Sequence, residues 1–374
     1  MHIVKPIIYD KFECVGKECI FTCCGGWEIP VEEEICTKCK EYEGNVEYDS
    51  KLNIYKMKMD NRTVCPFLNE SQLCTLVLQG KELSTTCREF PRTYANTGVM
   101  EKNLMLDCPQ VVALLENLKE PLVFIEEEDG KVDCNEEENE EVTLFHDIRI
   151  GIIAWLQKRE LPLWYRIFFT AFCLNKIDRM SGRGEIENEM GKMLSKQYYE
   201  TLLASISSIA CDSRKQFEEI RSIIIQLNGF LLLPLMDDKS GSRSKALRLM
   251  VKNQDCSFEE YQELYSRWER EQTVGFEILS ENIAVYQWFQ FSSQGKDFMR
   301  SNFLAILLEY LLIRHFSILS YAIWGEYDVV TLRFIIALAS RAIRIRKDNN
   351  DYKEWLEEME KGILSAANLY CLLK

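Results

Sequence analysis

The sequence predicts a mainly α-helical protein in which a small cysteine-rich N-terminal domain precedes an irregular helical domain. Three observations predict this class. Ten of the 15 cysteines lie before residue 109, apolar residues follow a helical spacing from about residue 143 onward, and a strongly acidic stretch separates the two parts. A chain of 374 residues is long for one hydrophobic core, so two domains are expected. We place the cysteine-rich domain at 1–118, an acidic linker at 119–142 and the helical domain at 143–374.

Glycine and proline residues divide the cysteine-rich domain into short elements. One helix is expected over residues 31–42, where acidic side chains fill the first turn. A second is expected over 109–118, where Pro109 stands at a tolerated helix start. The remainder reads as loops and short turns that something other than a large apolar core must organise. A bound metal centre would supply that organisation.

The stretch from Glu126 to Glu141 carries ten acidic side chains against one lysine and almost no apolar residue. Such a composition cannot bury enough apolar surface to pack, so we interpret it as a solvated linker between the domains. An acidic arm that recruits a basic partner is the alternative.

The helical domain contains eight stretches with helical spacing of apolar residues: 147–160, 163–180, 186–209, 215–232, 257–272, 303–324, 328–347 and 351–373. No fixed-period repeat connects them, so a solenoid is not predicted. The region 237–256 starts with polar residues and is expected to be a mobile loop. Residues 303–324 have the length of a membrane span, but Glu309, Arg314 and His315 lie near the middle, so a buried helix without membrane insertion is expected.

The chain has a formal net charge of −14. Nucleic acids and anionic membranes would repel it, so we expect no nucleic-acid partner.

The cysteines before residue 109 are too closely spaced to be ordinary core residues. The N-terminus has no apolar segment of signal-peptide length, so we expect a cytoplasmic protein. Structural disulfides are rare in that compartment, and clustered cysteines there more often bind metal. Thiolates select zinc or iron–sulfur clusters, and four thiolates complete either site. The candidate ligands are Cys14, Cys19, Cys23, Cys24, Cys65, Cys74, Cys87 and Cys108.

The segments FECVGKECIFTCCGGWEI, CPFLNESQLC, TTCREFPR and LDCPQVVALL resemble the flagellin lysine-N-methylase family, within the broader bacterial class that has a CxxCxxCC-type iron- or zinc-chelating domain. The resemblance covers the first 115 residues or so, and the helical remainder resembles the family more loosely. It implies a methyltransferase that moves methyl groups from S-adenosylmethionine to lysines of flagellin, with a [4Fe-4S] cluster involved. The cysteine-rich domain is too small to hold both a metal centre and a broad protein-binding surface, so we expect the helical domain to bind the substrate.

Eight thiols exceed the need of one cluster, so either two centres exist or some of the eight pack around one. Arg88 and Arg92, which follow Cys87 in the segment CREFPR, are candidates to offset thiolate charge or to bind a carboxylate of the cofactor. Trp27 would either shield a cluster or serve as a core residue. Cys36 and Cys39 read as half-buried side chains, with a ligand role as the alternative.

The five remaining cysteines are expected to be core or surface residues: Cys134, Cys173, Cys211, Cys256 and Cys371. No glycine-rich nucleotide fingerprint is present, so the catalytic residues and the mode of S-adenosylmethionine binding stay open. The alternative function is a zinc- or iron-binding interaction module without enzymatic activity.

Overall fold

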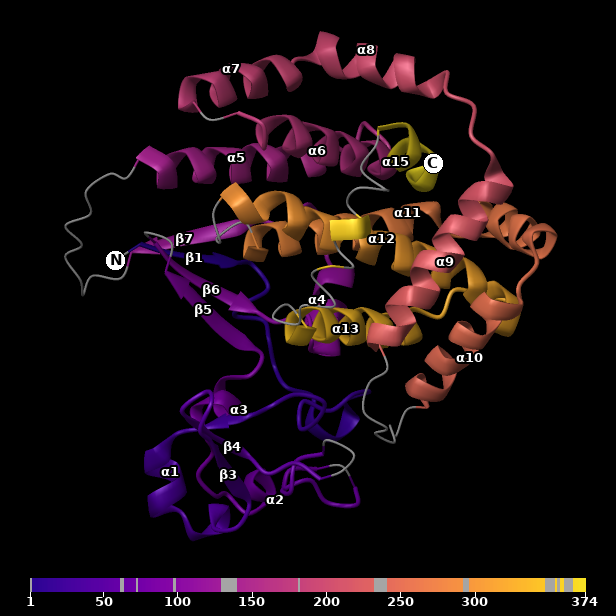
Figure 1. Cartoon of the computed structure of the whole chain (residues 1–374). Coiled ribbons are helices and arrows are strands. Elements are labelled where there is room, and N and C mark those ends of the chain that lie inside the picture. The colour runs from indigo at the N-terminus through magenta and orange to yellow at the C-terminus, as the bar shows by residue number, and fades with distance from the viewer. Residues whose placement is uncertain are drawn as a thin grey trace.

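The computed structural model describes residues 2–60, 64–71, 73–96, 99–128, 140–180, 182–231, 241–291, 296–346, 354, 357–359 and 366–374. Helices dominate these residues, as predicted, and the strands lie in the N-terminal part. Figure 1 shows a large assembly of helices with a sheet at one side, and a smaller lobe that projects below them. Residues 129–139 of the predicted acidic linker lie outside the described residues.

The helices from residue 140 onward form a layered body around one core. They are α5 (Glu140–Leu156), α6 (Leu163–Ile177), α7 (Arg183–Met193), α8 (Lys196–Ser207), α9 (Ser213–Leu231), α10 (Ser242–Asp255), α11 (Phe258–Phe291), α12 (Lys296–Trp324), α13 (Val329–Arg346) and α15 (Ala366–Leu373). Helix α12 is central, because it contacts α6, α9, α10, α11 and α13. Its segment Asn302–Trp324 is apolar enough to cross a membrane, but the most apolar stretch of that segment is buried inside the protein, which matches the expected buried helix.

Three predicted elements of the helical domain differ in the structure. Helix α11 continues to Phe291, well past the expected end at residue 272. The region 237–256 is helical from Ser242, because Ala246, Leu249 and Asn253 fall on one face and are buried. The stretch 186–209 is broken at Leu194 and Ser195, where the Ser195 hydroxyl donates to the Lys192 carbonyl. Such local bonds compete with continuation of a helix.

A four-stranded sheet lies against this body. Its order is β5 (Arg92–Asn96), β6 (Met100–Leu104), β1 (His2–Pro6) and β7 (Phe124–Glu128). β1 runs parallel to β6 and antiparallel to β7. Helix α4 (Pro109–Glu116) follows the sheet with Pro109 in its first turn, which confirms the expected helix. Part of the predicted linker is a strand. Phe124 to Glu128 pair with Pro6 to His2 of β1, and the Phe124 ring stacks on Phe289.

Residues 13–90, which we call the cysteine lobe, hold the remaining elements. They are α1 (Glu33–Lys38), α2 (Thr75–Leu78), α3 (Thr85–Glu89) and a three-stranded sheet in the order β2 (Pro30–Val31), β4 (Ile54–Met57) and β3 (Val46–Asp49). The expected helix over 31–42 is only α1 followed by a 3₁₀ turn at Lys40–Tyr42. The expectation of loops alone was wrong, since short strands join these turns.

The two hydrophobic cores divide the chain differently from the predicted boundary at residue 118. The core of the lobe is small: Ile29, Val31, Tyr42, Met57, Cys65, Phe67 and Leu76. Residues on both sides of the lobe, such as Ile8, Leu104 and Val111, belong to the large core of the helices. We call this larger unit, comprising the four-stranded sheet, α4 and the helices from α5 onward, the helical body.

Candidate metal centre

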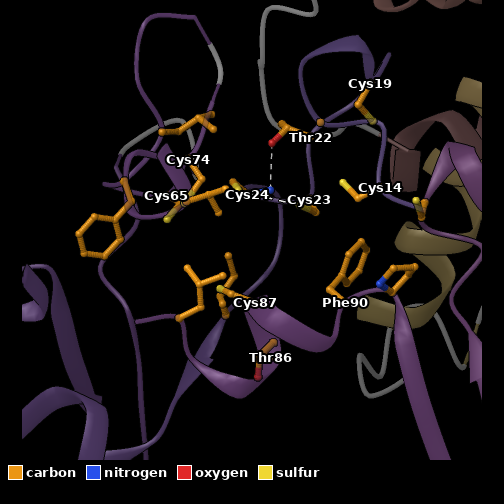
Figure 2. A pocket seen from close by; sticks show the side chains of 18 of the residues that line it. Cys14, Cys19, Thr22, Cys23, Cys24, Cys65, Cys74, Thr86, Cys87 and Phe90 are labelled. Atoms are coloured by element: carbon orange, nitrogen blue, oxygen red, sulfur yellow. Dashed lines mark hydrogen bonds between the residues drawn. The ribbon is translucent and has the colours of Figure 1, made fainter. Parts of the chain in front are cut away.

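One cavity of about 490 Å³ lies where the cysteine lobe meets the helical body. All eight predicted cysteine ligands line it, together with Arg88, Arg92 and Trp27. Figure 2 shows the thiols arranged around the cavity from separate segments of the chain. The structure thus brings together every residue that the sequence singled out for this site, over a separation of more than 90 residues. Their roles as ligands stay a prediction.

Short helices and turns place these cysteines. Cys19 ends the 3₁₀ turn at Gly16–Glu18, and Cys74 and Cys108 are the N-caps of α2 and α4. Cys87 lies in the first turn of α3, where its backbone N–H donates to the Ser84 hydroxyl at 3.3 Å. The amide of Cys65 donates to the Cys24 carbonyl at 2.9 Å, which ties two cysteine segments side by side.

Burial keeps most of the thiols protonated in this structure. It raises the pKa of Cys65 and of Cys108 to about 12 and that of Cys87 to about 11. Cys23 differs, because a hydrogen bond from the Cys24 thiol lowers its pKa to about 7, and the charge of Arg341 also lowers it. Metal binding requires thiolates, so loading this cavity would release protons.

The donor set suits a thiophilic metal. Eight thiols face a single cavity, and the Sγ atoms of Cys23 and Cys24 lie 3.9 Å apart. Within the residues that the structure describes, no three cysteine, histidine or acidic side chains converge closely enough to enclose an ion. A bound metal would therefore require some of these side chains to turn inward.

Arg341 joins the helical body to the cysteine lobe, and the sequence analysis missed it. It projects from α13, is 1% exposed and lines the cavity. Its guanidinium donates to the carbonyls of Thr22 at 3.1 Å and Gly25 at 2.9 Å. It also lies 3.8 Å from the Asp107 carboxylate and 4.2 Å from the centre of the Phe21 ring. An arginine inside the apolar run LRFIIALASRAI was the available signal, since buried arginines are normally paired.

The other predicted side chains occupy distinct positions at the cavity. Arg88 is largely exposed and donates to Thr85 Oγ1, whereas the Arg92 guanidinium lies over the ring of Phe12 at 5.2 Å. Trp27 is half-buried, faces Phe90 at 6.0 Å and donates its indole N–H to the Cys23 carbonyl. Trp27 thus forms part of the apolar wall.

The cysteines outside the cavity correct one expectation. Cys36 and Cys39 are half-buried against the core of the lobe, as the simpler interpretation predicted. Cys173 and Cys256 are buried and free. Cys211 and Cys371 form a disulfide across 160 residues, so the expectation that they are merely core or surface residues was wrong. Cys134 lies outside the described residues.

A family model described as the FliB lysine N-methylase C-terminal domain matches residues 149–372. This match covers the helical part, whereas the resemblance noted in the sequence was carried mainly by the first 115 residues. No curated protein and no solved structure matches the chain.

Proposed function

The chain belongs to the FliB lysine N-methylase family, and from that premise we propose that it methylates lysine side chains of flagellin with S-adenosylmethionine as the donor. We further propose that cysteines of the cavity hold a [4Fe-4S] cluster. One observation supports the site above others: the eight cysteines meet at a cavity whose wall includes Arg341 of the matched domain.

Methyl transfer needs a neutral amine, because only its lone pair can attack the methyl carbon. The nitrogen–carbon bond forms as the carbon–sulfur bond of the sulfonium breaks, the proton on nitrogen passes to water, and S-adenosylhomocysteine leaves. Phe12, Phe21, Trp27 and Phe90 give the cavity an apolar wall. Such a wall would remove water from a lysine ammonium and lower its pKa, and it would align the amine with the methyl group.

Arg88 and Arg92 are the proposed contacts for the carboxylate of the donor. Both follow Cys87 in the chain and line the cavity. A guanidinium matches a carboxylate in a two-point contact. Cysteines of the cavity would hold the cluster, which would supply a second contact for the methionine part of the donor.

The decisive experiment compares the holoprotein with the metal-free protein. The protein is purified without oxygen, incubated with S-adenosylmethionine and flagellin, and flagellin is measured by mass spectrometry. We expect lysines to gain methyl groups only with the holoprotein. Full activity after complete removal of iron would eliminate the proposed role of a cluster, and zinc without iron or sulfide would favour the alternative of a metal-binding interaction module.

Single substitutions sharpen this comparison. Serine at Cys19 or Cys23 should abolish both metal binding and methylation. Serine at Cys173 is the matched control, because that thiol is buried in α6 and does not line the cavity. Equal metal content in all three variants would contradict the ligand assignment.

We also propose that the helical body makes most contacts with flagellin and that the protein acts in the cytoplasm. Hydrogen exchange of the full chain with and without flagellin tests the first point. Protection confined to the cysteine lobe would contradict it.

A further inference from the structure

The eight cavity cysteines fall into two sets of four. We infer that each set binds its own thiophilic metal centre: a lobe centre on Cys24, Cys65, Cys74 and Cys87, and a seam centre on Cys14, Cys19, Cys23 and Cys108. The inference rests on the part of the proposed function that places metal at this cavity, and it assigns the surplus of thiols to a second centre.

Hydrophobic packing separates the two sets. Cys65 is a member of the small core of the lobe, and Cys24, Cys74 and Cys87 pack against that same core. Cys108 instead belongs to the large core of the helical body. The segment that carries Cys14, Cys19 and Cys23 begins after Phe12 of the large core, and Phe21 within it packs on that core. One set is thus embedded in the lobe, and the other lies along the seam between lobe and body.

Backbone contacts hold the lobe set together without the body. The Cys65 amide bonds to the Cys24 carbonyl, and Gly25 bridges to Val64. Leu68 bridges to Cys74, so the chain between Cys65 and Cys74 closes on itself. These contacts fix three of the four lobe cysteines on one small framework.

The two sets meet at Cys23 and Cys24, which are adjacent in the chain and whose Sγ atoms lie 3.9 Å apart. The two centres would therefore lie next to each other.

Charge and exposure predict different characters for the two centres. The Arg341 guanidinium lines the cavity and donates to the carbonyls of Thr22 and Gly25, next to Cys23 and Cys24, so it would offset the negative charge of thiolates there. Cys14 and Cys23 are exposed, whereas every cysteine of the lobe set is buried or half-buried. A closed four-thiolate site in the small core is typical of a structural centre. The seam centre is the more accessible of the two.

The test counts metal and sulfide in the full-length protein after anaerobic purification. The probes are the double variants Cys65→Ser/Cys74→Ser and Cys14→Ser/Cys19→Ser. Cys36→Ser/Cys39→Ser is the control, because this pair lies in the lobe but does not line the cavity. We expect two centres in the wild type and in the control, and one in each probe variant. A single centre in the wild type, or loss of all metal in both probe variants that fold, would overturn the inference.

A chelator time course on the wild-type protein covers the case in which a variant does not fold. We expect release in two phases, with seam metal lost first and about half of the total metal retained. Release in a single phase would overturn the inference. A protein with two centres that does not methylate flagellin would support this inference and contradict the proposed function. A protein with one centre that does methylate flagellin would contradict this inference and support the proposed function.

Discussion

The cysteine lobe and the helical body are stabilised in different ways. In the body, long helices bury continuous apolar faces, and α12 is surrounded on all sides by other helices. In the lobe, short strands and turns enclose a core of a few side chains, and half-buried cysteines make up much of its periphery. Small units with little apolar core commonly depend on metal or disulfides. From this comparison we expect the lobe, unlike the body, to depend on a bound metal for its stability.

Removal of metal should produce the largest difference between the two regions. A structural metal site can contribute on the order of 10 kcal/mol to folding. We expect a chelator to make amide exchange in residues 13–90 fast while α11 and α12 stay protected. Hydrogen exchange with mass spectrometry measures both regions in one sample. Unchanged protection in the lobe would break the comparison.

Truncation of the body core should have the next largest effect. Phe316 of α12 is fully buried. Phe316→Ala leaves a cavity and should lower the free energy of unfolding by about 3–5 kcal/mol. Circular dichroism during urea unfolding measures the change. The control Ile150→Ala, at a side chain that is 51% exposed, should stay within about 0.5 kcal/mol of the wild type.

Substitution of Arg341, which contacts both regions, should weaken the attachment of the cysteine lobe to the helical body. Arg341→Met removes the bonds to Thr22 and Gly25 and the charge beside Asp107. Removing one partner from a buried charged contact costs about 3 kcal/mol. We expect faster proteolysis within the lobe and a smaller effect on the body. Arg333→Met on the same helix is the control, because the ion pair of Arg333 with Glu116 is partly exposed. Its loss should lower the free energy of unfolding by less than about 1 kcal/mol. Equal proteolysis of both variants would contradict the role of Arg341.

The smallest expected effect is a pH dependence confined to the body. Burial, with the charges of Arg314 and Arg221, lowers the pKa of His315 from 6.5 to about 3. Its ring contacts Asn253 and Tyr261. The unfolded chain takes up a proton below pH 6.5 and the folded chain does not, so stability falls as pH falls. Because of His315, the wild type should lose about 2 kcal/mol of its free energy of unfolding between neutral pH and pH 5. His315→Gln should not show this loss. Parallel pH profiles for the variant and the wild type would show that His315 is not held neutral.

The sequence predicted which side chains gather at the cavity better than it predicted the fold around them. The clustered cysteines were expected to lie together, and all eight line one cavity. The helices of the body were recognisable because their apolar faces repeat at helical spacing. Both results depend on local patterns in the sequence.

What the sequence did not predict depends on contacts between distant segments. The strand at Phe124–Glu128 is acidic and becomes a strand by pairing with β1. The disulfide between Cys211 and Cys371 could be predicted only by knowing that α15 packs against α9. Arg341 reaches the cysteine lobe across 319 residues. A residue pattern within one segment of the sequence cannot predict such long-range contacts.

The contact of Arg341 with Thr22 also bears on the order of synthesis. The residues lie 319 positions apart, so a ribosome that adds about 5–20 residues per second makes Thr22 roughly 15–65 s before Arg341. During that time the nascent lobe carries its cysteines without the helix that closes one wall of the cavity. The seam between lobe and body is therefore complete only after Arg341 has left the ribosome, and until then the cavity lacks the wall that α13 supplies.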